Sequence, residues 1–325
     1  RLIVCRVGKV VTMNRRNFII NSSWSTFGLV TMCSSAQKDS PFAVVLGTAQ
    51  DGGYPQAGCK KDCCKGLWED VSRRRDVASL GIVDPVTEQR WFIECTPSFP
   101  RQVRRLDGAY PKLGGEIDGI MLTHAHIGHY AGLIHLGREV MGAKSVLVHV
   151  MPRMEKFLRT QGPWSQLVEL KNIELKPMRD NRPVHLNNRI KVYPFLVPHR
   201  DEFSETVGFK IEGPSNKILW LPDIDKWEKW NTPLEKVLRG VDVAYLDGTF
   251  YAQGELPGRD MSKIPHPLIA ETIRRLEGKE DSLRRKVRFI HLNHTNPAHN
   301  PNSVATRQIE KAGMCVAVQG ERVEL

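Results

Sequence analysis

The sequence predicts a layered fold of β-sheets and α-helices, and three observations support this prediction. Short apolar runs typical of strands alternate with helical segments between residues 42 and 320, and no linker interrupts them. The chain has 325 residues, of which 41% are hydrophobic, so it can form one large core. Several of the apolar runs end in a histidine or an aspartate. An α/β sandwich brings such strand ends together along one edge of its sheets.

The apolar run 119–122 leads directly into residues 123–129, which have the sequence THAHIGH. On an extended segment His124 and His126 point to the same side, because side chains alternate along a strand. His129 follows at the start of a turn or helix and can face a neighbouring position. Imidazole is the commonest nitrogen ligand for zinc and related ions at neutral pH. This spacing therefore predicts a metal site.

Three further apolar runs end in residues that can ligate a metal. Residues 190–198 end at His199, residues 217–222 end at Asp223, and residues 287–290 lead into His291. Each of these alone has a simpler explanation, because a capping aspartate or a surface histidine is more common than a ligand. Together they indicate that one set of ligands gathers at the edge of a sheet.

This order of motifs resembles the metallo-β-lactamase superfamily, whose αββα sandwich packs two mixed β-sheets between outer helices. The resemblance covers most of residues 42–320. It implies that the histidines and the aspartate described above hold two metal ions, the first bound by His124, His126 and His199, the second by His129 and His291, and both by the bridging Asp223.

The chain departs from the superfamily signature H-x-H-x-D-H at one position, because Gly128 replaces the aspartate. The missing side chain normally ligates the second metal. The second site is then expected to be weak, empty or completed by another carboxylate, for which Asp51, Asp201 and Asp247 are candidates. The substitution Gly128→Asp is expected to raise the occupancy of the second metal.

A second motif points to particular groups within this superfamily. Residues 46–59, with the sequence LGTAQDGGYPQAGC, resemble the N-terminal segment of the pyrroloquinoline-quinone biosynthesis protein B group and of the related cyclic phosphodiesterase group. In such proteins a cysteine cluster holds a structural zinc away from the active site. The resemblance implies a Cys₃His site, and this ligand set suits structural zinc. Its expected ligands are Cys59, Cys63, Cys64 and His294, with His299 in reserve. A disulfide or free buried thiols are the alternatives.

The composition changes before Pro41. Residues 13–20 resemble a twin-arginine export signal, and Ser34-Ser35-Ala36 offers small residues for cleavage. We therefore expect residues 1–36 to be an export signal with an upstream extension, and residues 37–325 to form a single domain. A disordered tail is the alternative. The apolar stretch is too short and interrupted for a membrane span. The expected location is the periplasm or cell envelope, and otherwise the cytoplasm.

The formal net charge of the chain is +11. Five positive charges and no negative charge lie in residues 1–36, and removing five from eleven leaves +6. Basic runs such as 73–75 and 284–286 are most simply solvated faces, and they could attract an anionic small-molecule substrate. No aromatic interleaving or nucleic-acid module accompanies them, so nucleic acid is not an expected partner.

The expected chemistry is hydrolysis of an ester, a lactone or a phosphodiester-type bond. A bound zinc ion lowers the pKa of its water from about 15.7 to roughly 7, which makes hydroxide available at neutral pH. Asp223 and His129 are expected to act in catalysis. Asp247 and Asp201 are candidate general acids.

Two other functions remain open from the sequence. A histidine-rich site with one carboxylate also suits iron, and the resemblance to biosynthesis protein B implies an iron-dependent oxygenase as an alternative. The third hypothesis is a metal-binding scaffold that has lost catalysis with the signature aspartate.

Overall fold

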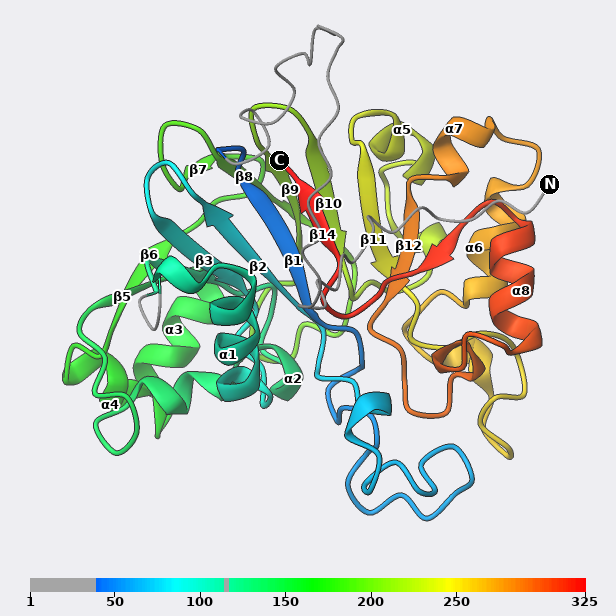
Figure 1. Ribbon diagram of the computed structural model, residues 1–325, viewed down its shortest axis with the longest axis horizontal. Helices are drawn as coiled ribbons and strands as arrows, with labels where there is room; N and C mark the ends of the chain where they lie inside the picture. The colour runs from blue at the N-terminus through cyan, green and yellow to red at the C-terminus, as the bar shows by residue number, and fades with distance from the viewer. Residues whose placement is uncertain (1–38, 114–116) are drawn as a thin grey trace, which may run out of the picture.

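The computed structural model describes residues 39–113 and 117–325, so the predicted export signal at residues 1–36 lies outside the described residues. Two seven-stranded β-sheets pack face to face, and helices cover both outer faces (Figure 1). This is the αββα arrangement that the sequence predicts, and the expected fold class is confirmed.

The first sheet has the order β14-β1-β2-β3-β4-β5-β6. Its first four strands pair antiparallel, and β3 to β6 pair parallel, so the sheet is mixed. In chain order its strands are β1 (Phe42–Gly47), β2 (Ser79–Asp84), β3 (Gln89–Ile93), β4 (Gly119–Met121), β5 (Val146–Val150), β6 (Ile173–Pro177) and β14 (Arg322–Glu324).

The second sheet has the order β13-β12-β11-β10-β9-β8-β7. Strands β7 to β10 pair antiparallel, and β10 to β13 pair parallel. Its strands are β7 (Val184–His185), β8 (Lys191–Leu196), β9 (Val207–Glu212), β10 (Lys217–Leu221), β11 (Val243–Asp247), β12 (Val287–Ile290) and β13 (Cys315–Val316).

The helices divide between the two outer faces (Figure 1). The first sheet is covered by α1 (Phe99–Ala109), α3 (Pro152–Thr160) and α4 (Trp164–Glu169), and the short α2 (Ile127–Tyr130) follows β4. The second sheet is covered by α5 (Leu234–Arg239), α6 (Ile269–Leu276), α7 (Asp281–Arg284) and α8 (Val304–Lys311).

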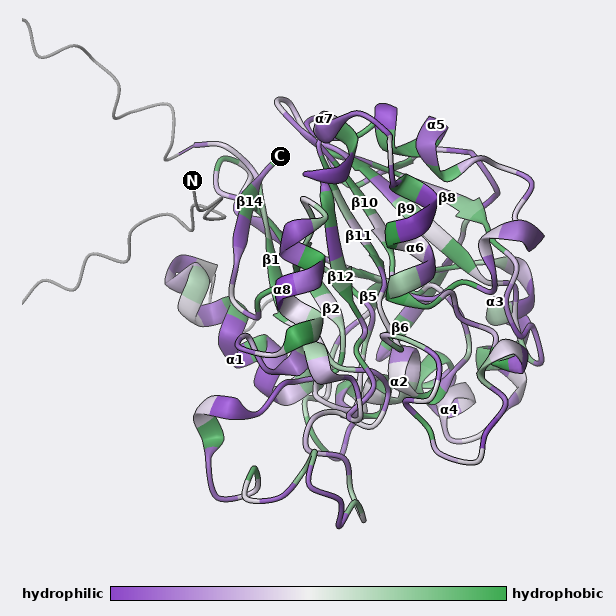
Figure 2. Cartoon of the chain, turned by 90° about the vertical axis from the view of Figure 1, so that its right-hand side faces the viewer, coloured by the Kyte–Doolittle hydropathy of each residue, from purple (hydrophilic) through white to green (hydrophobic). Residues whose placement is uncertain are grey.

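Three apolar layers hold these elements together, and the strands supply them by alternation. On β3, Trp91 points into the layer between the sheets, whereas its neighbour Phe92 packs under the helices. Trp91 shares the layer between the sheets with Phe209 and Trp220. Both faces of the central strands are therefore buried, which explains their nearly continuous apolar sequences. Figure 2 shows the same division, with hydrophobic residues along the strands and hydrophilic ones on the outer helices.

Local sequence signals set the ends of the helices. Ser303 caps α8, because its hydroxyl oxygen accepts a hydrogen bond from the backbone N–H of Thr306 at 3.0 Å. Gly313 follows the same helix with a φ of +80°, a conformation that glycine adopts without strain. In the part of the chain that the structure describes, no helix is long and apolar enough to span a bilayer.

Candidate metal centre

The ends of four strands deliver the predicted ligands to one edge of the sandwich. His124 and His126 lie in the loop after β4, and His129 lies in α2, which follows that loop in the sequence. Asp223 follows β10, and His291 follows β12. His199 stands three residues beyond the end of β8, and the other predicted ligands of the first metal come within reach of it.

The first set of side chains consists of three histidines and one aspartate, whose ligand atoms all lie within 4.8 Å of one another. The Nε2 atom of His124 lies 2.8 Å from Nδ1 of His126 and 3.3 Å from Oδ2 of Asp223. The Nε2 atom of His199 lies 3.5 Å from Oδ1 of the same aspartate. These four residues are the set that the resemblance assigned to the first metal.

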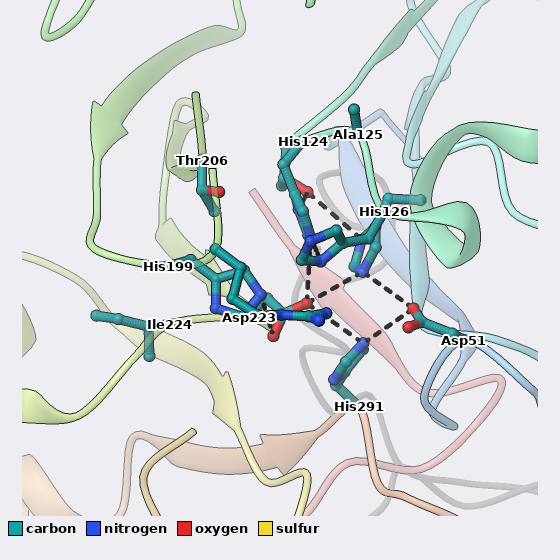
Figure 3. Close-up of polar contacts among 12 residues, drawn as sticks. Asp51, His124, Ala125, His126, His199, Thr206, Asp223, Ile224 and His291 are labelled. Carbon is teal, nitrogen blue, oxygen red and sulfur yellow. Dashed lines mark hydrogen bonds and ion pairs between the residues drawn. The ribbon is translucent and has the colours of Figure 1, made fainter. Parts of the chain in front are cut away.

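A second set faces the first across Asp223, and it contains Asp51, His129 and His291. The Oδ1 atom of Asp51 lies 3.4 Å from Nε2 of His129 and 3.7 Å from Nε2 of His291. The Oδ2 atom of Asp223 lies 3.3 Å from the same nitrogen of His129. Figure 3 shows Asp223 between the two groups, with Asp51 and His291 on the side away from His199. Of the three candidate carboxylates, the structure brings Asp51 into the second set.

The glycine of the signature and Asp51 occupy one space. A Cβ atom on Gly128 would lie 2.6 Å from the Cα atom of Asp51 and still closer to its carboxylate. Contacts under 3.0 Å force something to move, and here the obstacle includes backbone. The side chain introduced by Gly128→Asp would collide with the carboxylate already present, so this contact argues against the expected gain in metal occupancy.

The chemistry of the donor atoms fits a metal. Several buried nitrogen and oxygen atoms at this edge have no hydrogen-bond partner within the described ranges, although buried polar atoms are normally satisfied. Imidazole and carboxylate donors of this kind suit zinc and iron. The unsatisfied atoms of both sets are Asp51 Oδ1, His129 Nε2, both ring nitrogens of His199, Asp223 Oδ1 and His291 Nε2.

A buried glutamate orients the histidines of the first motif. Glu94 is fully buried, and its Oε1 atom accepts a hydrogen bond from the hydroxyl of Thr123 at 2.7 Å. The same oxygen lies 3.3 Å from Nδ1 of His129. The hydroxyl of Thr123 also lies 2.9 Å from Nδ1 of His124. Both rings therefore turn Nε2 toward Asp223, as partners behind metal-binding histidines usually ensure.

Two residues of the site have left-handed backbones. Glu94, directly after β3, has a φ of +73°, and His291, directly after β12, has a φ of +64°. Such conformations cost roughly 1–3 kcal/mol each for residues other than glycine, and they cluster at functional sites. Their presence where two strands end is consistent with side chains that are placed for chemistry.

The carboxylates and histidines shift one another's pKa values. Burial alone would raise the pKa of Asp51, but His129 and His291 hold it well below its usual range. Burial disfavours a charged ring at His129, yet Glu94 and Asp223 outweigh this and raise the pKa of that ring well above its usual value. Burial lowers the pKa of His199 to about 4.

The predicted cysteine cluster also assembles. Cys59, Cys63, Cys64 and His294 offer ligand atoms within 4.8 Å of one another. The Nδ1 atom of His294 lies 3.5 Å from Sγ of Cys63 and 3.4 Å from Sγ of Cys64. All three cysteines are free thiols, so the disulfide alternative is not formed. His299 stays outside the cluster, because its ring stacks on Tyr54 at 3.9 Å.

Comparison with known families decides where the chain belongs. A family model described as the beta-lactamase superfamily domain matches residues 83–292, which is more than half of the sequence. The chain belongs to the β-lactamase superfamily. The matched segment holds the ligands from His124 to His291, whereas Asp51 and the cysteine cluster lie before it, and His294 lies after it.

Relatives from two bacterial species are similar to this chain over most of its length. Coenzyme PQQ synthesis protein B from Xanthomonas campestris pv. campestris is 27% identical over 311 residues, which cover 87% of this chain and 99% of the relative. The protein of the same name from Methylobacterium nodulans is 26% identical over 314 residues, with the same coverage. The resemblance predicted from the motifs is therefore confirmed.

Solved structures share the superfamily fold over nearly the same span. Zn²⁺-bound PqqB from Methylobacterium extorquens superposes with a TM-score of 0.70 and 21% identity, covering 87% of this chain and 100% of that chain. A diphosphatase from the PhnP family superposes with a TM-score of 0.62 and 21% identity, covering 88% and 97% of the respective chains.

Two residues of this superfamily site, His266 and Glu94, are not among those predicted from the sequence. His266 is buried, and its Nδ1 atom lies 2.8 Å from Oδ2 of Asp247 and 3.1 Å from Oδ1 of Asp223. It follows no apolar strand, so the signal that identified the other histidines is absent. Glu94, by contrast, ends the apolar run of β3 and could have been found by the same rule as His199.

The two candidate general acids occupy different places. Asp247 is fully buried behind the ligands, where its Oδ1 atom accepts a hydrogen bond from the hydroxyl of Thr249 at 2.7 Å. That hydroxyl lies 3.0 Å from Nδ1 of His291, so Asp247 supports a ligand through Thr249. Asp201 is exposed, accepts a hydrogen bond from Thr206 at 2.8 Å and joins neither ligand set.

Proposed function

We propose that this chain is a metal-dependent hydrolase that holds two divalent ions, most simply zinc, and cleaves a phosphodiester, ester or lactone bond. The observation that carries the proposal is the pair of ligand sets that meet at Asp223. With Asp51 in the space beside Gly128, each set has three ligands of its own in addition to the shared carboxylate. The loss of the signature aspartate therefore does not imply loss of catalysis.

The roles of the side chains follow from their contacts. A pair of divalent ions supplies hydroxide at neutral pH and stabilises the attacking and leaving oxygens. Asp223 directs its two oxygens toward both ligand sets and would fix the spacing between the ions. Glu94 and Thr249 hold the Nδ1 sides of His129 and His291 and so keep their Nε2 atoms turned inward.

His266 is the residue best placed to donate a proton to the leaving group. Burial disfavours its charged form, but the carboxylates of Asp247 and Asp223 outweigh this and raise its pKa to about 9. In the metal-free chain the ring therefore favours the form with two N–H groups, and Asp247 engages Nδ1. Asp247, the general acid expected from the sequence, would then act as the positioning residue behind His266.

The cysteine cluster supports a second metal role in the same chain. Three thiol sulfurs and one imidazole form the donor set of a closed structural zinc site, which contributes directly to folding. Zinc is bound in the PqqB structure from Methylobacterium extorquens, which has the same fold. We propose structural zinc at the cluster and catalytic zinc at the edge of the sheets.

Elemental analysis combined with turnover tests the proposal. Protein purified without added metal should contain more zinc than the cysteine cluster alone can hold, and it should hydrolyse at least one member of a panel of phosphodiesters, esters and lactones. His126→Ala should abolish that turnover and retain the zinc of the cluster. Full edge-site metal without turnover on any substrate would instead support an inactive metal-binding scaffold.

A second candidate function is oxygen chemistry at iron. It is favoured by the relatives, because the proteins matched over 87% of this chain carry the name coenzyme PQQ synthesis protein B. Histidine and carboxylate ligands also suit iron. Iron that disappears with His126→Ala, together with oxygen consumption and no hydrolysis, would favour this candidate over the hydrolase.

A further inference from the structure

A cleft of about 310 Å³ opens beside the second ligand set. Asp51 lines it with a side chain that is 26% exposed, while the buried Oδ1 atom of that side chain faces His129. The backbone of Gly52 and Gly53 continues the wall away from the metal ligands. A group bound in this cleft would therefore lie next to the proposed metal pair.

Four arginines line the same cleft: Arg74, Arg75, Arg101 and Arg105. The sequence suggested that the run 73–75 forms a solvated face, and this holds for Arg73, which is exposed. Arg74 and Arg75 are only partly exposed, because they turn toward the cleft.

Among the residues that the structure describes, one carboxylate inside the cleft pairs with these arginines. Buried Asp76 lies 2.6 Å from Nε of Arg101 and 3.0 Å from Nη2 of Arg105. Asp51 also lines the cleft, but its Oδ1 atom is directed to the metal-ligating histidines. Within the cleft, Asp76 therefore balances about one of the positive charges.

The other two guanidinium groups bond to uncharged oxygens. Nη1 of Arg75 donates to the carbonyl oxygens of Ser72 and Arg74 at 3.0 and 2.9 Å. Nε of Arg74 donates to the carbonyl oxygen of Leu67 at 3.2 Å. These bonds fix the side chains in place, and no carboxylate of the described residues forms an ion pair with either group.

The arginines also repel one another. Burial lowers the pKa of the Arg75 guanidinium, and the positive charge of Arg105 lowers it further. The Nε atom of Arg105 is buried and has no hydrogen-bond partner among the residues that the structure describes. Like charges that line one cleft are stabilised by an anion, and guanidinium forks match phosphate and carboxylate oxygens.

We propose that this cleft binds an oxyanion of the substrate, a phosphate or carboxylate group separate from the bond that is cleaved. The role in substrate recognition rests on the proposed hydrolase function, whereas the binding of the anion does not.

Calorimetric titration with inorganic phosphate and with acetate tests the site. Metal ions at the edge also attract anions, so the titrations are made in the His126→Ala background, which lacks the first ion, as well as in the wild-type chain. In that background Arg75→Gln removes one charge of the cleft, and Arg75→Lys retains the charge without the fork. Arg138→Gln is the matched control, because Arg138 is exposed, pairs with Glu139 at 2.9 Å and lies outside the cleft.

We expect His126→Ala to retain binding of one anion, and Arg75→Gln to weaken that binding about tenfold or more, as for the loss of a charged hydrogen bond. Arg75→Lys should recover part of the lost affinity for the anion. Arg138→Gln should leave that affinity within about twofold of its value without the substitution, because an exposed ion pair contributes little. Tighter binding of phosphate than of acetate, or the reverse, would identify whether the cleft prefers a phosphate or a carboxylate group. The proposed anion site would be overturned if His126→Ala alone abolished anion binding, or if Arg75→Gln left that binding unchanged. Either outcome would leave the hydrolase proposal intact.

Discussion

The carboxylate of Asp51 lies in the space that a side chain at residue 128 would need. A Cβ atom on Gly128 would stand 2.6 Å from the Cα atom of Asp51, although the two residues lie far apart in the sequence. The aspartate absent from the signature is thus replaced by one from another segment. A glycine at 128 is the condition for that replacement, because any larger residue displaces Asp51.

Gly128→Ala should lower the occupancy of the second metal, and Gly128→Asp should lower it as well, because both residues add a Cβ against the backbone of Asp51. Elemental analysis of the purified variants measures the loss. Gly108→Ala is the matched control, since a Cβ there meets nothing within 4 Å. A second metal retained in full by Gly128→Asp would contradict the steric account.

The two ligand sets should lose metal independently. Asp51→Ala removes a ligand of the second set only, so the first ion and the zinc at the cysteine cluster should remain. His126→Ala should instead release the first ion, and each variant should reduce hydrolysis by orders of magnitude because both ions act on the reaction. Metal titration monitored by calorimetry distinguishes the sites. If Asp51→Ala retained all the ions that the wild-type chain holds, Asp51 would not be a metal ligand.

Glu94→Gln tests the support behind the histidines. The neutral amide can still accept a hydrogen bond from Thr123, but it loses the charge that favours the orientation of His129. Loss of such a partner typically weakens metal binding 10–100-fold. Competition with a chelator measures the affinity, and the exposed Glu139→Gln provides the control. An unchanged affinity would mean that packing alone orients the ring.

Cys63→Ser should remove the structural zinc and lower the thermal stability. The cluster joins the segment of Asp51 to the segment of His291, because Cys59 and His294 follow these two residues closely in sequence. We therefore expect the second metal at the edge to bind more weakly as well. Thermal unfolding with and without a chelator measures the first effect. A wild-type melting temperature that is insensitive to chelation would exclude a folding role for the cluster.

Metal affinity at the second set should depend on pH. Because the pKa of His129 is raised well above its usual value, its ring is protonated near neutral pH in the metal-free protein, and a metal must displace that proton. Affinity should then rise about tenfold per pH unit until pH exceeds that pKa. The first set is the internal control, because the pKa of His199 is about 4 and its ring is already neutral. Zinc titrations at pH 6 and 7 that show equal affinity at the second set would contradict this assignment.

The sequence by itself determined the fold class and most of the ligands. Strand runs ending at Asp223 and His291 could be recognised because burial on both faces imposes continuous apolar sequence, and because chemistry follows directly at the strand ends. The cysteine cluster was equally predictable from residues 59–64. These are local patterns, in which a few adjacent residues carry the signal.

Only the tertiary structure decided which carboxylate completes the second set and which charges meet in the cleft. Asp51, Asp201 and Asp247 are equivalent as sequence, and the choice among them depends on the approach of one loop to Gly128. His266 could not be predicted from the sequence either, because only the packing of the fold brings it to Asp223. Contacts between segments distant in sequence leave no periodic pattern, since each side chain is fixed by a partner from elsewhere in the fold.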